Sequence, residues 1–242
     1  MKIFYIIFLS SCYFLFSCKK ENRKDCIKST GEIIIQERVT AHFDSILVHN
    51  NIILFLKHDT VRSIKIEAGQ NLIPLIETKI ENNQLIISNN NRCNFMRSYE
   101  PTINVTVSVP DLKHLQHTGS GDVKSINTLK VNRIRVVNSG VGDINLDLDA
   151  GNVFTQIYGS GGINLSGKAA VCEIYSTGNC FMHCENLFTG YTYIYSNTTG
   201  NIHVHAQKEL GVTILGSGNV YYTGNPLITK QDISGKGSLY KQ

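Results

Sequence analysis

A short glycine phrase recurs through the second half of this 242-residue chain at a nearly constant interval. Its copies read Gly-x-Gly, Ser-x-Gly or Thr-x-Gly and are followed by Asp, Asn, Gly or Ser. The final glycines of the seven copies are Gly121, Gly142, Gly161, Gly178, Gly200, Gly218 and Gly237. Neighbouring copies are therefore 17 to 22 residues apart. Self-similarity at such a period is typical of a solenoid, in which each repeat forms one coil stacked on the previous one.

The residues between the glycines alternate as strands do. In residues 144–148 apolar side chains alternate with Asn and Asp, a turn is expected at 149–152, and a second strand covers 153–158. At a rise of ~3.3 Å per residue, such strands and corners use about 20 residues per coil, and successive coils pair in parallel. We therefore predict an all-β, single-stranded parallel β-helix, or β-solenoid, with rungs of about 20 residues and Gly-x-Gly-Asp/Asn corners.

The polar residues of the phrase have a structural interpretation. Glycine suits a corner that needs a positive φ or a close approach of two backbones, and Asp or Asn beside it can bond the amides of its own turn. Because the acid at Asp122 and Asp143 gives way to Gly, Asn and Ser in later copies, we interpret the phrase as a backbone corner. We also expect hydrogen-bonded ladders of asparagines and serines, the serines being Ser120, Ser139, Ser160, Ser176, Ser217 and Ser234.

The part of the chain before these repeats also has strand patterns. Residues 63–68 and 102–109 alternate with a period of two. One helical turn is expected at 71–76, with Asn71 as its cap.

The N-terminus has the pattern of an export signal. A nearly apolar run covers residues 3–16, which is too short for a convincing membrane-spanning helix. It ends Leu15-Phe16-Ser17-Cys18, which resembles a bacterial lipobox, so we predict a lipoprotein signal peptide over 1–17 and lipidation of Cys18. Cleavage at Cys12, an ordinary secretory signal and a signal anchor are the alternatives. The polar residues 18–31 are expected to form a flexible tether, followed by one β-helix domain over 32–242.

Several segments together resemble one family. These are Phe43-Asp44-Ser45-Ile46, Gly119 to Val123, Gly161 to Asn164 and Ser234 to Gly237. They are similar to the head GIN domain family of auto-transporter adhesins, which occurs widely in Bacteroidetes lipoproteins, and the similarity covers roughly residues 40–240. The resemblance implies a right-handed β-helix and a location in the cell envelope. It implies no catalytic residues and no defined activity.

Five cysteines remain after the signal peptide and Cys18 are set aside. The segments around Cys26 and Cys93 resemble a cysteine-containing subgroup of the same family, and a disulfide between them would attach the tether to the domain. Two unrelated free thiols are the alternative, because sequence alone does not establish connectivity. Cys172, Cys180 and Cys184 are expected to be buried or paired thiols.

We tested the sequence for catalytic and metal-binding patterns. Enzymes built on β-helices cluster acids on one outer face, whereas the acids Asp122 and Asp143 occur at only two of the corners. Calcium-binding repeats are about half as long as these. A zinc site at Cys180, His183 and Cys184 lacks the usual Cys-x2-Cys pair, and His203 and His205 lack a visible third ligand, so surface histidines are the safer interpretation. We expect no catalytic site, metal or cofactor.

One tyrosine pattern points to binding. Tyr191, Tyr193 and Tyr195 share one face of a predicted strand. If they are exposed, they would suit contact with a carbohydrate or a protein. The alternative is that these rings pack into the core or under a loop.

These observations give one functional hypothesis. We expect a lipid-anchored, non-enzymatic protein of the bacterial outer membrane, periplasmic or surface-exposed, that binds a surface glycan or protein. The net charge of +4 is mild and does not indicate a nucleic-acid partner. A polysaccharide-acting enzyme and a structural spacer that assembles with copies of itself are the alternatives.

Overall fold

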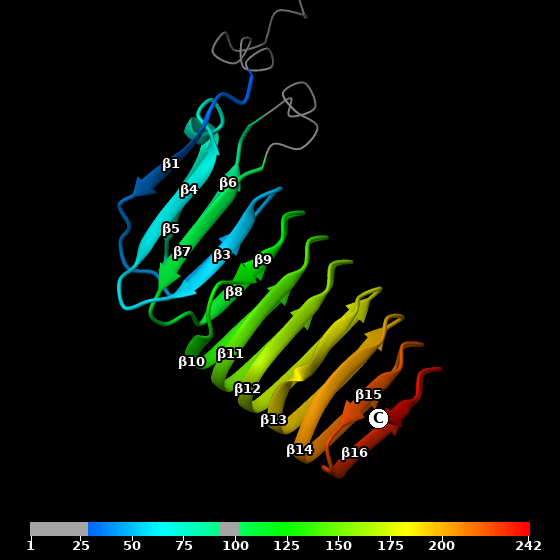
Figure 1. The fold of residues 1–242 in the computed structure, drawn as a ribbon. Helices are drawn as coiled ribbons and strands as arrows, with labels where there is room; N and C mark the ends of the chain where they lie inside the picture. The colour runs from blue at the N-terminus through cyan, green and yellow to red at the C-terminus, as the bar shows by residue number, and fades with distance from the viewer. Residues whose placement is uncertain (1–28, 92–101) are drawn as a thin grey trace, which may run out of the picture.

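The computed structural model describes residues 29–91 and 102–242, which form a β-solenoid whose strands stack along one axis (Figure 1). The stack runs from the N-terminal strands at the top of the view to the C-terminal strands at the bottom. The first strands are β1 (Ile33–Arg38), β2 (Ser45–Val48), β3 (Ile53–His58), β4 (Ser63–Gly69), β5 (Ile76–Glu81), β6 (Gln84–Asn89) and β7 (Asn104–Val109). The predicted signal peptide, Cys18, Cys26 and Cys93 lie outside the described residues.

The repeats form the rest of the stack. Their strands are β8 (His114–His117), β9 (Val123–Ser125), β10 (Leu129–Asn138), β11 (Ile144–Ile157), β12 (Ile163–Gly178), β13 (Met182–Thr198), β14 (Ile202–Ile214), β15 (Val220–Thr223), β16 (Leu227–Ile233) and β17 (Leu239–Lys241). From β8 onward every pairing between neighbouring rungs is parallel. The predicted parallel β-solenoid is confirmed.

The core consists of equivalent apolar side chains stacked from rung to rung. One column runs in register through Ile144, Ile163, Met182, Ile202 and Val220, and all five are fully buried. Each strand alternates between such inward residues and outward polar residues, as a strand with one buried face must. The register of the stack therefore assigns every outward side chain to a column as well.

The corner expected at 149–152 is a bend within a strand. β11 stays paired through it, with Asp149 opposite Lys168 and Ala150 opposite Ala169. At the bend, the regular alternation of buried and exposed residues is interrupted: the inward residue after Leu148 is Val153. Parallel stacking holds the ladder together across the bend, since the neighbouring rungs bend at the same place.

The glycine phrase is explained by close packing of backbones. A Cβ on Gly142 would collide with the carbonyl oxygen of Gly121, and one on Gly161 would collide with that of Gly142. Only Gly178 among the seven phrase glycines has a positive φ. The corners therefore need glycine mainly because adjacent rungs touch there.

The Asp and Asn of the phrase form a ladder along the corners. The Oδ1 of Asp122 accepts from the backbone N–H of Asp143 at 3.1 Å, and the Oδ1 of Asp143 accepts from that of Gly162 at 2.6 Å. Asn201 and Asn219 repeat this arrangement at later corners. The expected serine ladder is wrong, because Ser139 donates to the His117 carbonyl while Ser176 lies fully buried in the interior.

The N-terminal part departs from uniform parallel pairing. β1 pairs with β4, β4 with β7, and β5 with β6, all antiparallel. The β5–β6 hairpin turns through Asn82 and Asn83, which both have positive φ, as a two-residue type I′ turn requires. A turn this short can join only antiparallel strands, so this end differs from the repeats.

The expected helical turn is a single 3-10 turn over Ile73–Leu75. The predicted cap at Asn71 is wrong: Leu72 occupies the cap position and makes no side-chain cap bond. The side-chain Nδ2 of Asn71 donates instead to the backbone carbonyl of Ser29 at 2.9 Å. Among the described residues, no helix has the length and apolar character needed to cross a membrane.

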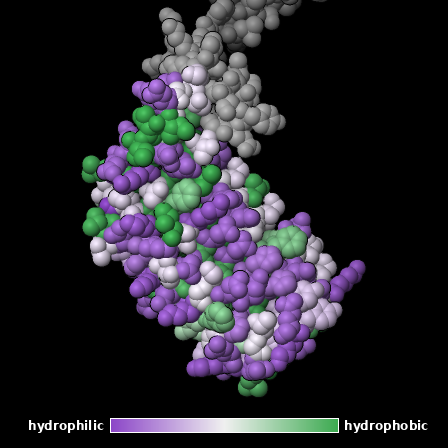
Figure 2. All heavy atoms as spheres, viewed as in Figure 1, coloured by the Kyte–Doolittle hydropathy of each residue, from purple (hydrophilic) through white to green (hydrophobic). Residues whose placement is uncertain are grey.

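Polar side chains cover most of the face seen in Figure 2. Apolar side chains gather in the part of that view where Figure 1 places β1. There, Ile33 and Ile35 are 72% and 67% exposed.

Candidate binding face

The tyrosines that the sequence suggests as a binding face, Tyr191, Tyr193 and Tyr195, lie on the outer face of β13. Tyr193 and Tyr195 are 40% and 36% exposed, and Tyr191 is half-buried. They alternate with the inward residues Thr192 and Ile194, so the interpretation that places them in the core does not hold.

Two of the outward tyrosines stack because they are in register. Tyr175 of β12 lies opposite Tyr195 of β13, and their rings are parallel with centroids 4.8 Å apart. Tyr158 extends the group, with its centroid 6.1 Å from that of Tyr175. The stack fixes the Tyr195 ring on the surface without burying it.

A shallow groove lies beside these tyrosines. Tyr175, Tyr193 and Tyr195 line a hollow of about 390 Å³ together with Gly211 and Lys230. Gly211 lies directly opposite Tyr193 in β14 and has no side chain to fill the next place in the column. The Tyr193 ring therefore lies over Gly211, where a Cβ would come within 2.9 Å of the ring.

The Tyr193 hydroxyl is held at the edge of this hollow. It donates to the carboxylate of Glu209 at 3.3 Å. Desolvation and the nearby Glu209 charge raise the pKa of Tyr193. The hydroxyl therefore remains a protonated donor at neutral pH.

A larger hollow of about 840 Å³ continues from the first. Phe154 and Glu173 line both hollows, and Lys113, Arg133 and Arg135 line the larger one. We call the two together the side groove, with a basic end at Lys113, Arg133 and Arg135 and a tyrosine end at Tyr175, Tyr193 and Tyr195. The basic end was not among the predicted sites, although the Arg-x-Arg spacing in the sequence puts both arginines on one strand face.

The basic end has a defined arrangement. The Arg135 guanidinium lies over the Phe154 ring, 5.2 Å from its centroid, and donates to Gln156. Lys113 pairs with Asp44 at 2.9 Å, and this bond raises the pKa of Lys113. Burial, together with the Arg135 charge, lowers the pKa of His114, which lies in register with Arg135. Among the described residues, the cations of this end that have no carboxylate ion pair are Arg133 and Arg135.

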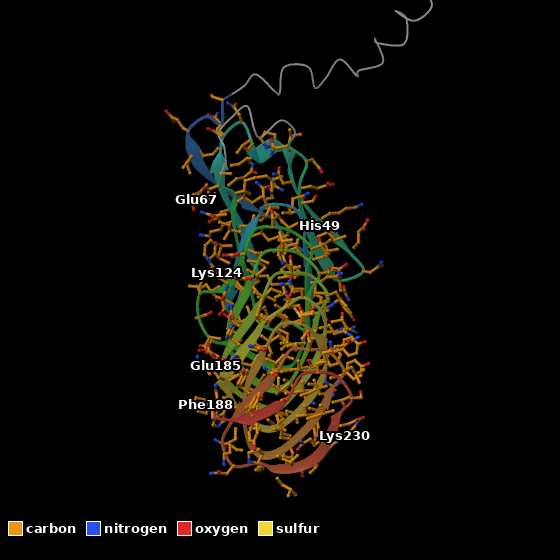
Figure 3. The ribbon with its side chains drawn as sticks, turned by 90° about the vertical axis from the view of Figure 1, so that its right-hand side faces the viewer. His49, Glu67, Lys124, Glu185, Phe188 and Lys230 are labelled. Carbon is orange, nitrogen blue, oxygen red and sulfur yellow. The ribbon has the colours of Figure 1, made fainter. Side chains whose placement is uncertain are left out.

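The other side of the solenoid carries a separate aromatic column. His183, His203, Tyr221 and Tyr240 stack one per rung, with centroids 5.4, 4.7 and 5.3 Å apart. Figure 3 places Lys124, which lies in the same outward column, on the side opposite Lys230 of the side groove. The sequence predicts His203 and His205 as surface histidines. It does not reveal the column, whose signal is that these residues recur once per rung.

The structure does not bring the suspected metal ligands together. Cys180 and Cys184 are buried, whereas His183 points outward with its Nδ1 3.5 Å from Glu185. His205 bonds Thr223 through Nδ1 at 2.8 Å. Within the described ranges, no group of three or more His, Cys, Asp or Glu is arranged to hold a metal ion.

The three cysteines of the repeats are free and buried, as predicted. Burial raises the pKa of Cys172 to about 12 and raises that of Cys184 well above its usual value. Both thiols therefore stay protonated and act as small core side chains.

The acids of the corners are engaged in structural hydrogen bonds. Asp122 and Asp143 accept backbone amides, and Asp122 also pairs with Lys124 at 3.1 Å. The side groove is lined by the acids Asp111 and Glu173, which belong to different rungs. The hydrogen bonds of Asp122 and Asp143 to backbone amides match the structural role that the sequence predicts for these corner acids.

Comparison with known proteins supports the same fold. The crystal structure of a putative adhesin from Bacteroides fragilis NCTC 9343 is 21% identical, with a TM-score of 0.79 over 87% of this chain and 97% of that one. A putative adhesin from Parabacteroides distasonis ATCC 8503 is 18% identical, with a TM-score of 0.70 over 88% and 98%. A protein from the same strain described as a putative lipid binding protein is 22% identical, with a TM-score of 0.67 over 88% and 98%.

No curated protein matches the chain. The family described as "Putative auto-transporter adhesin, head GIN domain" matches residues 42–226, which include the strands from β2 to β15 and so most of the strands that line the side groove. The chain therefore belongs to the head GIN domain family of auto-transporter adhesins.

Proposed function

We propose that this protein is a lipid-anchored adhesin of the bacterial outer membrane that binds a surface glycan or protein through the side groove and catalyses no reaction. The observation that supports binding most directly is the pair of exposed rings, Tyr193 and Tyr195, beside a hollow that runs on into the basic end. Rigid rungs hold these side chains in place, so a ligand would meet a preorganised surface.

The family supports a role at the cell surface or in the envelope. The lipobox-like segment ending at Cys18 supports a lipid anchor, which would hold the solenoid on a membrane without crossing it. Incorporation of a labelled fatty acid, lost in Cys18→Ser and retained in Cys12→Ser, tests the anchor. Labelling that survives Cys18→Ser would contradict it.

Two features favour binding without catalysis. The corner carboxylates are committed to backbone amides, and the groove acids Asp111 and Glu173 lie on separate rungs beside basic residues. General acid–base chemistry on a glycan needs two carboxyl groups that face one bond.

The test is a binding screen of the full-length protein in detergent against glycan and protein arrays. We expect the double variant Tyr193→Ala/Tyr195→Ala to lose the ligands that the wild type binds. Tyr240→Ala is the matched control, because Tyr240 is 48% exposed and belongs to the column on the other side. Unchanged binding by the double variant, with an unchanged melting temperature, would contradict the proposal.

End-to-end assembly is a second candidate function. Ile228 and Ile233 lie in register with Leu210 and Ile214, which are fully buried, but are themselves 38% and 37% exposed. A further rung from a second copy would cover them. A monomeric mass in size-exclusion chromatography with light scattering, across the micromolar range, would remove this candidate.

A further inference from the structure

We propose that the side groove takes an anionic polysaccharide, whose acidic groups bind at Arg133 and Arg135 and whose sugar rings lie on the aromatic side chains. This inference rests on the proposed function and names the class of ligand that the groove accepts. It follows from the order of charged and aromatic side chains along the groove.

The groove is one linear feature that follows the solenoid axis. A single outward column runs in register through Arg135, Phe154, Glu173, Tyr193, Gly211 and Lys230. Five rung-to-rung steps of ~4.8 Å make this column about 24 Å long. A groove of this length suits an extended polymer better than a compact small molecule.

The basic end is suited to acidic groups. Arg133 and Arg135 are two residues apart on β10, both are exposed, and their side chains leave the same face of the strand about 6.6 Å apart. Among the described residues, neither arginine forms an ion pair with a carboxylate, whereas Lys113 is paired with Asp44. The two guanidinium groups therefore have free donors.

The chemistry of arginine defines what these donors bind. A guanidinium offers a planar pair of N–H groups that matches a carboxylate, sulfate or phosphate. Arg135 is also oriented by the Phe154 ring below it. Two such groups at neighbouring positions would contact acidic substituents on a repeating chain.

The remainder of the groove is suited to sugar rings. Tyr193 and Tyr195 provide ring faces for the C–H faces of sugars, and the half-buried Asn152 offers a hydrogen-bonding amide in the larger hollow. A protein partner would instead favour a contiguous apolar centre with a polar rim. The alternation of charged and aromatic side chains from Arg135 to Tyr193 favours a polysaccharide over an acidic protein.

The test measures binding of the full-length protein in detergent to five probes. Polygalacturonate carries carboxylates, dextran sulfate carries sulfates, teichoic acid carries phosphates, dextran is neutral, and poly-L-glutamate is an acidic peptide. We expect binding to at least one of the three anionic glycans, and the first three probes distinguish which acidic group is preferred. We expect dextran and poly-L-glutamate to bind at least about tenfold more weakly.

The variant Arg133→Gln/Arg135→Gln should lower the affinity for the anionic glycan about tenfold or more. It should also make binding less dependent on salt concentration. The matched control Lys124→Gln/Lys168→Gln removes the same charge from other faces and should leave binding unchanged. Circular dichroism and melting temperature establish that both variants fold. Equal losses in the two variants would show that only net charge matters and would overturn the inference.

Other outcomes separate this inference from the proposed function. Equal binding of dextran, or stronger binding of poly-L-glutamate, would overturn the anionic glycan while leaving groove binding intact, provided that Tyr193→Ala/Tyr195→Ala abolishes it. No binding to any of the three anionic glycans also overturns the inference. A screen in which no glycan or protein binds would reject the proposed function as well.

Discussion

The ring of Tyr195 lies on the ring of Tyr175 with the two planes 2° apart and the centroids 4.8 Å apart. This spacing equals the distance between neighbouring strands, because the two residues are partners on consecutive rungs. The solenoid thus converts a repeat in sequence into a surface of stacked outward side chains.

The corner glycines should resist even the smallest side chain. Gly142→Ala places a Cβ against the carbonyl of Gly121, so two rungs must separate locally. We expect the free energy of unfolding to fall by about 1–3 kcal/mol or more, measured by urea denaturation. Gly162→Ala is the control, because its Cβ would first meet the Asp143 carboxylate at 3.3 Å and should cost less. Equal losses would show that backbone contact is not the cause.

The Asp of the corner should act as a hydrogen-bond acceptor. Asp143→Ala leaves the Gly162 amide without its 2.6 Å bond, and we expect a loss of about 1 kcal/mol of stability. Asp143→Asn retains an oxygen in the same place and should recover most of this loss in the same urea experiment. If Asn were as damaging as Ala, the carboxylate charge would matter rather than the acceptor.

Stability should decrease in mild acid. His117 is fully buried and its Nδ1 donates to Asn138 at 3.0 Å, and desolvation by burial is the main cause that lowers the pKa of His117. Because the unfolded chain then binds a proton more readily than the folded protein, stability is complete above the unfolded pKa of about 6.5 and declines as the pH falls toward the folded value.

His117→Gln should therefore reduce the slope of stability against pH between about pH 7 and pH 5. The burial-lowered pKa of His114 contributes a slope of the same sign that remains in this variant. Thermal unfolding in matched buffers across this range checks the prediction. A slope unchanged by the substitution would assign the pH dependence to other groups.

The buried thiols should be unreactive in the folded protein. Cys172, Cys180 and Cys184 are free and buried, and burial raises the pKa of each thiol. At pH 8 a thiol reagent should label them only after denaturation, as peptide mass mapping would show. Rapid labelling without denaturant would mean that the rungs open locally around β12 and β13.

The same mapping tests the predicted disulfide. Peptides containing Cys26 and Cys93 should be linked in a non-reduced digest and separate after reduction. In a Cys26→Ser variant, a new free thiol should then appear at Cys93. Two free thiols in the native protein would contradict the pairing.

The sequence by itself determined the class of fold. Recurrent glycines and alternating apolar residues leave little choice, because each rung can bury its inward face only against another rung. The sequence also identified the corner acids as turn residues and predicted that the cysteines of the repeats are buried or paired. It also placed Tyr193 and Tyr195 on one strand face, but it could not decide whether that face was inside or outside.

The tertiary structure alone decided which residues share a column. β13 contains Glu185, Asn186 and Leu187 between Cys184 and Phe188, whose partners in β14 are the adjacent residues Val204 and His205. Such irregularities shift the register by amounts that a repeat of 17 to 22 residues does not predict. The side groove joins Arg135 to Lys230 because each rung is aligned by the packing of its inward side chains, and this alignment depends on neighbouring rungs that are distant in sequence.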